Sequence, residues 1–187
     1  IIDGESGDEI QILYLSFNNL DETPSHEYLK RMVKLSYLDC TSNKLKRAHA
    51  LGKEISPTSI LLDNNNITEI VVSEGDYYCG LAQMETFSCS NNRLTKLPDI
   101  FTARSIYTMI SADFSSNEIS ELENGDAWRG INASTLNLAD NRLTTLSKRL
   151  IGSGSNIEVL MLSANGLRTL EEGVLTGPNS AMLSTID

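Results

Sequence analysis

Apolar residues recur along the chain in short runs with a spacing of two, and longer segments of mixed character separate the runs. In "IQILYLSFNNL" (10–20), Leu13 and Leu15 flank Tyr14, and in "IEVLMLSANGL" (157–167), Leu160 and Leu162 flank Met161. A period of two places both leucines of a pair on one face of a strand. Each run therefore predicts a short strand with one buried face, which needs neighbours to bury it.

The same pattern occurs in seven copies. Between the two copies already quoted lie "LSYLDCTSNKL" (35–45), "PTSILLDNNNI" (57–67), "METFSCSNNRL" (84–94), "MISADFSSNEI" (109–119) and "ASTLNLADNRL" (133–143). The asparagines that align across the copies are 25, 22, 27, 25, 24 and 24 residues apart. A repeat of this length predicts a solenoid in which stacked copies build one continuous core.

The aligned asparagine follows the strand, where the chain turns away. Its amide can donate to and accept from backbone groups that the turn leaves without partners. Stacked copies therefore predict a ladder of asparagines that satisfies buried peptide groups. The residues of this structural Asn ladder are Asn18, Asn43, Asn65, Asn92, Asn117, Asn141 and Asn165.

The motif L-x-x-L-x-L-x-x-N-x-L, repeated every 20 to 29 residues or so, resembles the leucine-rich repeat family, over residues 10–187 of this chain. The resemblance implies an α/β solenoid: a leucine-rich-repeat horseshoe with a parallel sheet on the concave face and irregular or short helical return segments on the convex face. "DC" (39–40) and "SC" (88–89), just before the asparagine turn, resemble bacterial cell-surface leucine-rich-repeat proteins. We expect a single domain over 1–187, with about seven full repeats from 10 to 182, the start of an eighth at 183–187, and more repeats in a longer array.

The return segments between the motifs are more variable. "LTKLPDIF" (94–101), "LTTLSKRLI" (143–151) and "LRTLEEGVL" (167–175) share an apolar residue three positions after the motif leucine. This spacing favours short helices or irregular turns with their apolar side inward. "SHEYLKRMVKL" (25–35) is the strongest helix candidate, because Pro24 suits a helix start.

Cys40 and Cys89 occupy the inward position that holds leucine or phenylalanine in the other copies. We interpret them as small core side chains, since a buried free thiol packs like an apolar group. They lie two repeats apart, roughly 10 Å at the usual strand spacing, which is too far for a disulfide. Cys79 lies on a return segment, where a packing residue beside Tyr77 and Tyr78 and a reactive thiol are both open.

Charge narrows the range of partners. The chain has 25 acidic and 15 basic residues, a formal charge of −10, and no block of basic residues. We therefore expect no nucleic acid and no anionic membrane surface as a partner. No apolar run reaches the roughly 18 residues of a membrane span, so we also expect no membrane insertion within this chain.

Motifs for catalysis or metal binding do not stand out. His26 and His49 have no cysteine or histidine partner at zinc-like spacing, and "DNNN" (63–66) lacks the glycine and glutamate of a calcium loop. Asp39 and Asp63 are diagonal neighbours on adjacent strands, about 7 to 8 Å apart, a distance that permits acid–base catalysis. An open sheet face, however, offers no pocket to orient a substrate. We therefore expect no enzyme, no catalytic residue, no cofactor and no metal.

The concave face comprises the residues that flank the inward positions of each strand. Its first two copies offer two tyrosines and an isoleucine, Ile12, beside an aspartate, which suits a cationic or amphipathic protein segment. A carbohydrate is a less favoured ligand. The candidate ligand-binding residues are Tyr14, Tyr37, Asp39, Leu61, Asp63, Asp113, Asn137 and Met161.

Leucine-rich repeat proteins are chiefly protein-binding scaffolds, so the resemblance implies a non-catalytic protein–protein recognition module. We expect it to be a bacterial surface or secreted module, extracellular or at the cell surface, that binds a protein ligand on the concave face. Two alternatives are a regulatory or targeting region of a larger enzyme and an intracellular scaffold in the cytoplasm. An adjoining catalytic domain would support the first, and a Cys79 that stays reduced would support the second.

Overall fold

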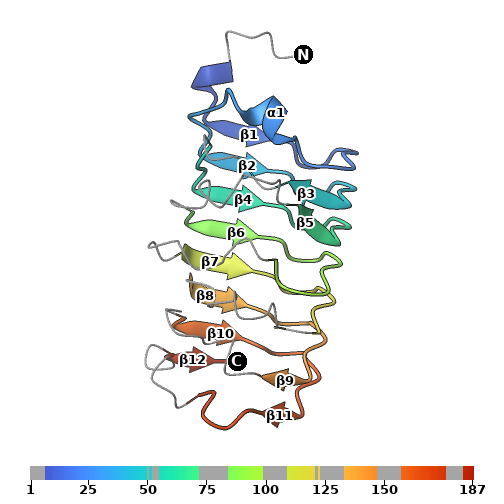
Figure 1. The fold of residues 1–187 in the computed structure, drawn as a ribbon, viewed down its shortest axis with the longest axis vertical. Helices are drawn as coiled ribbons and strands as arrows, with labels where there is room; N and C mark the ends of the chain where they lie inside the picture. The colour runs from blue at the N-terminus through green and yellow to red at the C-terminus, as the bar shows by residue number, and fades with distance from the viewer. Residues whose placement is uncertain are drawn as a thin grey trace.

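A computed structural model describes residues 7–49, 51, 55–71, 84–98, 109–120, 122, 133–146, 157–175 and 183–187. These segments form a β-solenoid in which one strand of each copy stacks on the strand of the next (Figure 1). A 3-10 helix at Gly7–Glu9 precedes the first strand. The stacked strands are β1 (Ile12–Tyr14), β2 (Tyr37–Asp39), β4 (Ser59–Leu61), β6 (Thr86–Ser88), β7 (Met109–Asp113), β8 (Ala133–Asn137), β10 (Val159–Met161) and β12 (Thr185–Ile186).

The main sheet has eight strands in the order β1-β2-β4-β6-β7-β8-β10-β12, and each neighbouring pair is parallel. Equivalent positions of successive copies lie opposite one another, as Leu13, Leu38 and Ile60 do. The parallel-sheet solenoid predicted from the repeat is therefore confirmed. Among the described residues, no helix is long and apolar enough to cross a membrane.

The return segments contain short strands where helices or irregular turns were expected. β3 (Arg47–His49) pairs with β5 (Glu69–Val71), and β9 (Thr145–Leu146) pairs with β11 (Thr169–Leu170), all in parallel. The apolar residue three positions after the final apolar residue of the motif is buried in four copies, as Ala48, Leu97, Leu122 and Leu146. The spacing of three thus marks an extended segment that packs on the core. Residues 99–101 and 147–151 of the expected segments lie outside the described residues.

The helix expected over 25–35 is much shorter in the structure. The only α-helix among the described residues, α1, spans His26–Leu29. Beyond it, the amide of Met32 donates to the Leu29 carbonyl and the amide of Leu35 donates to the Met32 carbonyl. These turns keep Leu29, Met32 and Leu35 buried in a row. Isolated turns therefore satisfy the same apolar spacing, and the chain reaches the start of β2 without a continuous helix.

Inward side chains of successive copies fill the core between the main sheet and the return segments. The final apolar residue of the motif is completely or almost completely buried in the five middle copies, as Leu45, Ile67, Leu94, Ile119 and Leu143. Cys40 and Cys89 are also fully buried and free. Phe87 and Phe114 add an aromatic contact between neighbouring copies, with ring centroids 5.6 Å apart.

The asparagines of the motif connect the copies through hydrogen bonds. The Nδ2 of Asn92 donates to the carbonyls of Cys89 and Ser90 in its own copy and of Leu62 in the preceding copy. Its Oδ1 accepts from the amide of Ile67, also in the preceding copy. Equivalent bonds join the preceding copy to the asparagines at 43, 65, 117, 141 and 165. These bonds fit the asparagine ladder expected from the sequence.

The residue before each ladder asparagine has a left-handed backbone conformation, with φ between 50° and 56°. Residues other than glycine, asparagine and aspartate adopt this conformation at a cost, because Cβ approaches the backbone. No position here is a glycine: the residues are Phe17, Ser42, Asn64, Asn91, Ser116, Asp140 and Ala164. The turn after each of the first seven strands of the main sheet therefore has the same backbone conformation even where its residue is poorly suited to it.

Candidate functional site

The register of the main sheet aligns one partly or fully exposed residue from each of its first seven strands into a single row. Cα pairing runs from Tyr14 through Asp39, Leu61, Ser88, Asp113 and Asn137 to Met161. Six of the eight candidate ligand-binding residues lie in this row. Tyr37 lies in the neighbouring row, opposite Ile12 and Ser59, and Asp63 lies two residues beyond Leu61. The structure thus brings all eight candidates onto one face.

Aromatic side chains gather at the N-terminal end of the concave face. The ring centroids of Tyr14 and Tyr37 are 5.5 Å apart and the rings are tilted by 56°. Tyr14 is 66% exposed, and neighbouring Ile12 is 53% exposed. Burial raises the pKa of the Tyr37 phenol, and the negative charge of Asp39 raises it further. The phenol of Tyr37 and the carboxylate of Asp39 are therefore close enough to interact.

Carboxylates in the middle of the concave face bind neighbouring side chains and backbone. The Oδ1 of Asp63 accepts from Ser88 Oγ at 2.5 Å and from the amide of Ser90 at 2.7 Å. Asp113 accepts from the amide and hydroxyl of Ser115 at 2.8 and 2.7 Å, and from Asn137 Nδ2 at 3.0 Å. These cross-strand bonds give Asp63, Asp113 and Asn137 a role in holding the sheet together, which the sequence did not reveal.

Asp39 differs from these two aspartates. One of its oxygens accepts from the amide of Thr41 at 2.9 Å, a bond within its own turn. Asp39 therefore keeps acceptor capacity for a ligand beside the two tyrosines. Asp39 and Asp63 are the pair whose spacing would permit acid–base catalysis. Asp39 accepts from the Thr41 amide, Asp63 accepts from Ser88 and Ser90, and both lie on an open sheet. Among the described residues, no group of three His, Cys, Asp or Glu side chains is placed to hold a metal ion.

The buried cysteines lie behind the same strands. Burial raises the pKa of the Cys40 thiol to about 12, and the charge of Asp39 contributes to this shift. Burial also raises the pKa of Cys89, with further contributions from Asp63 and Asp113. Both thiols thus remain protonated and unreactive at neutral pH. Cys79 lies outside the described residues.

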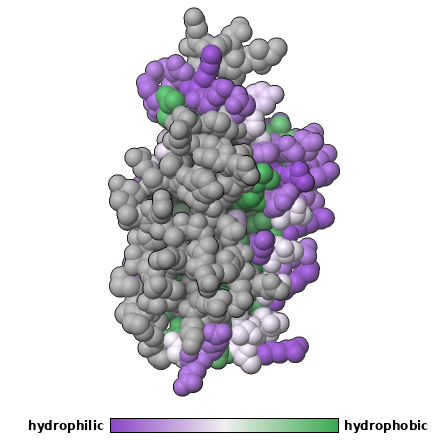
Figure 2. Space-filling model, viewed as in Figure 1, coloured by the Kyte–Doolittle hydropathy of each residue, from purple (hydrophilic) through white to green (hydrophobic). Residues whose placement is uncertain are grey.

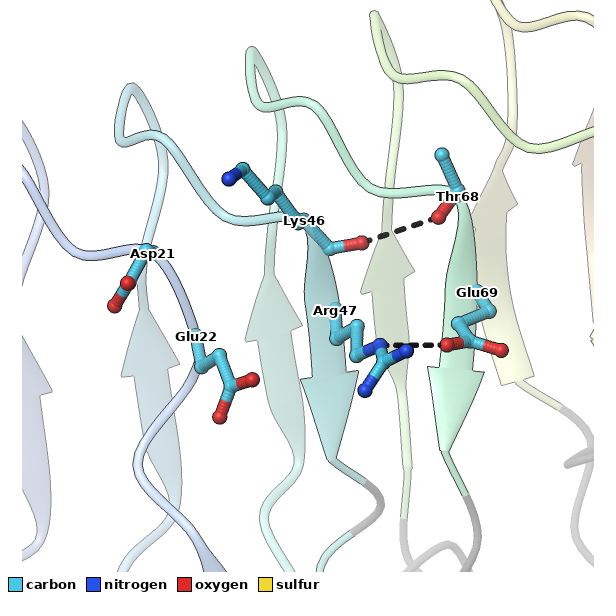
Figure 3. Close-up of a pocket in the computed structure, with 6 residues that line it drawn as sticks. All are labelled: Asp21, Glu22, Lys46, Arg47, Thr68 and Glu69. Atoms are coloured by element: carbon cyan, nitrogen blue, oxygen red, sulfur yellow. Dashed lines mark hydrogen bonds and ion pairs between the residues drawn. The ribbon is translucent and has the colours of Figure 1, made fainter.

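A polar groove of about 380 Å³ lies on the opposite side of the solenoid, next to β3 and β5. Figure 2 shows hydrophilic side chains along this edge of the molecule, and Figure 3 shows the residues that line the groove. Arg47 Nε pairs with Glu69 Oε1 at 2.7 Å, and Thr68 Oγ1 donates to the carbonyl of Lys46 at 3.4 Å (Figure 3). The other lining residues, Asp21 and Glu22, are also exposed. Exposed charges of both signs, with Arg47 already paired, make this groove a weaker site than the concave face.

Sequence reasoning placed Ile12 beside the tyrosines without naming it a ligand-binding candidate, and it missed Phe17, the other exposed apolar residue of the first copy. Ile12 lies opposite Tyr37, and Phe17, at the left-handed position after β1, is 84% exposed. Alignment of the copies carried a signal for both, because hydroxyl, amide or small residues occupy most of the equivalent positions. The apolar content of the first copy is therefore unusual for this face.

Two solved structures are similar to the chain. One is a leucine-rich repeat protein from Bacteroides eggerthii DSM 20697, with a TM-score of 0.82 and 33% identity, and the other is a leucine-rich repeat protein from Bacteroides thetaiotaomicron VPI-5482, with a TM-score of 0.81 and 35% identity. Each match covers 99% of this chain, which spans only 32% and 23% of those proteins. No protein-family model and no curated protein matches the chain. Its repeat, its architecture and these two similarities show that the chain is a leucine-rich-repeat solenoid.

Proposed function

We propose that the chain is a non-catalytic recognition module that binds a protein ligand on the concave face. The observation that carries this proposal is the apolar group formed by exposed Ile12 and Tyr14 with half-buried Tyr37 at one end of the main sheet. Tyrosine and isoleucine side chains bury much area on binding and lose little side-chain entropy when they do so. Hydroxylated and acidic side chains follow on the neighbouring strands, as Ser59, Asp39 and Asp63, so they can surround such an anchor with a polar rim.

We further propose that the module acts at a bacterial cell surface or outside the cell. The similarity to leucine-rich repeat proteins of Bacteroides supports a bacterial setting, and the resemblance of the motif to surface proteins supports the location. A cytoplasmic scaffold and a regulatory region of a larger enzyme are the alternatives. The enzyme alternative requires a catalytic domain beyond this chain, which spans about a third or a quarter of the similar proteins.

Selection of binders from a library of small displayed domains tests the concave face as the site. We expect binders selected on the wild-type chain to lose at least tenfold in affinity against Tyr14→Ala/Tyr37→Ala, because the aromatic anchor is removed. The matched variant is Lys46→Ala/Thr68→Ala, which alters two exposed residues of the groove on the opposite side. Retained binding to this second variant is expected.

The same measurement can contradict the proposal. Binders that lose affinity for the Lys46→Ala/Thr68→Ala variant would assign recognition to the groove, and binders unaffected by either pair would place it elsewhere. Circular dichroism on each variant checks that the solenoid is intact, which we expect because Tyr14, Lys46 and Thr68 are exposed.

A further inference from the structure

The concave face and its two margins are devoid of basic residues. We take the same seven aligned positions in each copy, which end at the left-handed residue: 11–17, 36–42, 58–64, 85–91, 110–116, 134–140, 158–164 and, at the last strand, 184–187. These segments contain no lysine, arginine or histidine, although the chain has 15 lysines and arginines. Their acidic residues are Asp39, Asp63, Glu85, Asp113, Asp140, Glu158 and Asp187.

This distribution gives the exposed sheet face a negative potential without opposing charge. Along the chain, the nearest basic residues are Lys34 before one segment, and Lys44, Arg93 and Arg142 just after ladder asparagines. Lys34 already pairs with Glu9 at 2.7 Å, and Arg142 pairs with Glu118 at 2.9 Å. A surface of one sign attracts a partner of the opposite sign and disfavours an acidic one. Charge complementarity therefore selects a cationic segment as the occupant of this face.

The aromatic end of the concave face offers a place for one cationic side chain of the partner. Tyr14 lies directly opposite Asp39 in the register, and Tyr37 precedes Asp39 by two residues on the same side of β2. The two rings are 5.5 Å apart, and Asp39 has acceptor capacity beyond its bond to the Thr41 amide. A cation on this niche meets aromatic rings and a carboxylate together.

We propose that the niche formed by Tyr14, Tyr37 and Asp39 binds an arginine side chain of an extended protein segment lying across the concave face. This proposal rests on the proposed function and names the chemistry of its partner. A planar guanidinium stacks on a tyrosine ring and can present two N–H groups to one carboxylate, which an ammonium group cannot do in the same fixed geometry. Arginine is therefore preferred to lysine.

A second positive charge of the segment has a defined place. Asp113 lies three strands from Asp39 in the same row, which is about 14 Å at the usual strand spacing. Four residues of an extended segment span about 13 Å, and residues i and i+4 point to the same side. A segment with arginine at i and at i+4 thus places one guanidinium on the niche and the other near Asp113.

Binding of synthetic peptides by calorimetry tests the inference on the complete chain. The probe is a capped nine-residue peptide of valine and serine with arginine at positions 3 and 7, compared with the same peptide carrying lysine or citrulline at both positions. Citrulline keeps the planar shape of arginine and removes its charge. We expect the arginine peptide to bind at least threefold more tightly than the lysine peptide and at least tenfold more tightly than the citrulline peptide.

Variants of the chain locate the binding site. Asp39→Asn removes the charge and keeps an oxygen for the Thr41 amide, and we expect it to weaken the arginine peptide at least tenfold. Asp140→Asn is the matched control. It removes one exposed negative charge from a margin of the concave face, away from the tyrosines. We expect a change below twofold for this control. Loss of binding with Tyr14→Ala and retention with Tyr14→Phe would show that the ring is the contact.

Each contrary result overturns the inference in a distinct way. Equal binding of the citrulline peptide, with sensitivity to Tyr14→Ala, would reject the arginine and leave the concave face as the recognition surface. Equal losses of affinity for the arginine peptide with Asp39→Asn and Asp140→Asn would reject the niche. They would indicate that the peptide is attracted by the total negative charge of the face. Absence of binding by all three peptides would reject a cationic segment, whereas the displayed-domain selection decides the proposed function separately.

Discussion

The ladder asparagines and the exposed row of the concave face follow the same strands and differ in almost every other respect. Every copy places asparagine in the ladder, and the five central ones are buried. The row that runs from Tyr14 to Met161 contains a different type of side chain in nearly every copy. Both sets come from positions that recur in register, so periodicity alone does not account for the difference.

The difference lies in the availability of water. A buried carbonyl or amide without a partner loses the hydrogen bond that water gave it, which costs about 1–3 kcal/mol, so only a side chain that both donates and accepts suits the ladder. A side chain on the concave face is in contact with water, so polar and apolar types are both tolerated there and its type can follow a ligand. Uniformity along the solenoid therefore indicates structure, and variety indicates a surface available for function.

Among the single substitutions, removal of one ladder asparagine is expected to change the free energy of unfolding most. Asn92→Ala deletes three donated bonds and one accepted bond, and we expect the free energy of unfolding to fall by about 2–4 kcal/mol. Tyr14→Ala on the exposed row is expected to lower it by less than about 1 kcal/mol, the value of an aromatic pair. Urea denaturation followed by circular dichroism measures both.

Asn18→Ala is the control within the ladder itself. Asn18 is exposed and donates to the carbonyls of Leu15 and Ser16 in its own copy, so its loss is expected to cost less than about 1 kcal/mol. Equal effects at Asn18 and Asn92 would show that burial does not distinguish the ladder positions.

The two buried thiols provide a second test of burial, through the dependence of stability on pH. The pKa of Cys40 is raised from 9.0 to about 12 in the folded chain, and that of Cys89 is raised as well. Above about pH 9 the unfolded thiols lose protons that the folded thiols retain, so the unfolded state binds fewer protons and stability falls as pH rises. The expected slope is about 1.4 kcal/mol per pH unit for each thiol.

Urea denaturation between pH 8 and pH 11 measures this dependence. The matched protein is Cys40→Ala/Cys89→Ala, whose stability is lower at neutral pH because two core side chains are shortened. We expect its disadvantage to shrink as pH rises, since it has no buried thiol to keep protonated. Parallel pH profiles for the two proteins would contradict the assigned burial of these thiols.

The smallest change in stability is expected at an exposed residue whose backbone is held in the left-handed conformation. Ala164 has φ of 54°, a left-handed conformation that costs a residue with a Cβ about 1–2 kcal/mol. Ala164→Gly removes this cost and increases the entropy of the unfolded chain, so we expect a net stabilisation of about 0.5–1 kcal/mol. Thermal unfolding followed by circular dichroism provides the measurement.

Ala139→Gly is the matched control, because Ala139 is on the same margin one copy earlier and is not among the positive-φ residues. There glycine brings only the entropic cost, and we expect a destabilisation of about 0.5–1 kcal/mol. Effects of the same sign at 139 and 164 would mean that the turn imposes no strain at 164.

The inward residues and the ladder were predictable because both depend on local periodicity. Alternation around Leu13 and Leu160 defined a buried strand face, and recurrence of the asparagine in every copy aligned the strands. Cys40 and Cys89 were assigned to the core by the same alignment. The eight candidate ligand residues share one face for this reason too, although their role in binding stays a prediction.

The return segments and the partners of the carboxylates were not predictable in this way. Apolar residues three positions apart fit a helix, a set of turns or a short strand. Tertiary packing decided between these at 25–35 and at β3, β5, β9 and β11. The sequence also could not distinguish Asp39 from Asp63 and Asp113, because their hydrogen bonds depend on side chains more than 20 residues away.

The sequence by itself determined which side chains face the core and where the chain turns, since each repeat encodes both in eleven consecutive residues. Only the tertiary structure decided which polar groups remain available on the concave face. Hydrogen bonding across strands uses part of the capacity of Asp63 and Asp113, whereas Asp39 stands beside two tyrosines with capacity to spare. That distinction arises from contacts between copies, which no single repeat specifies.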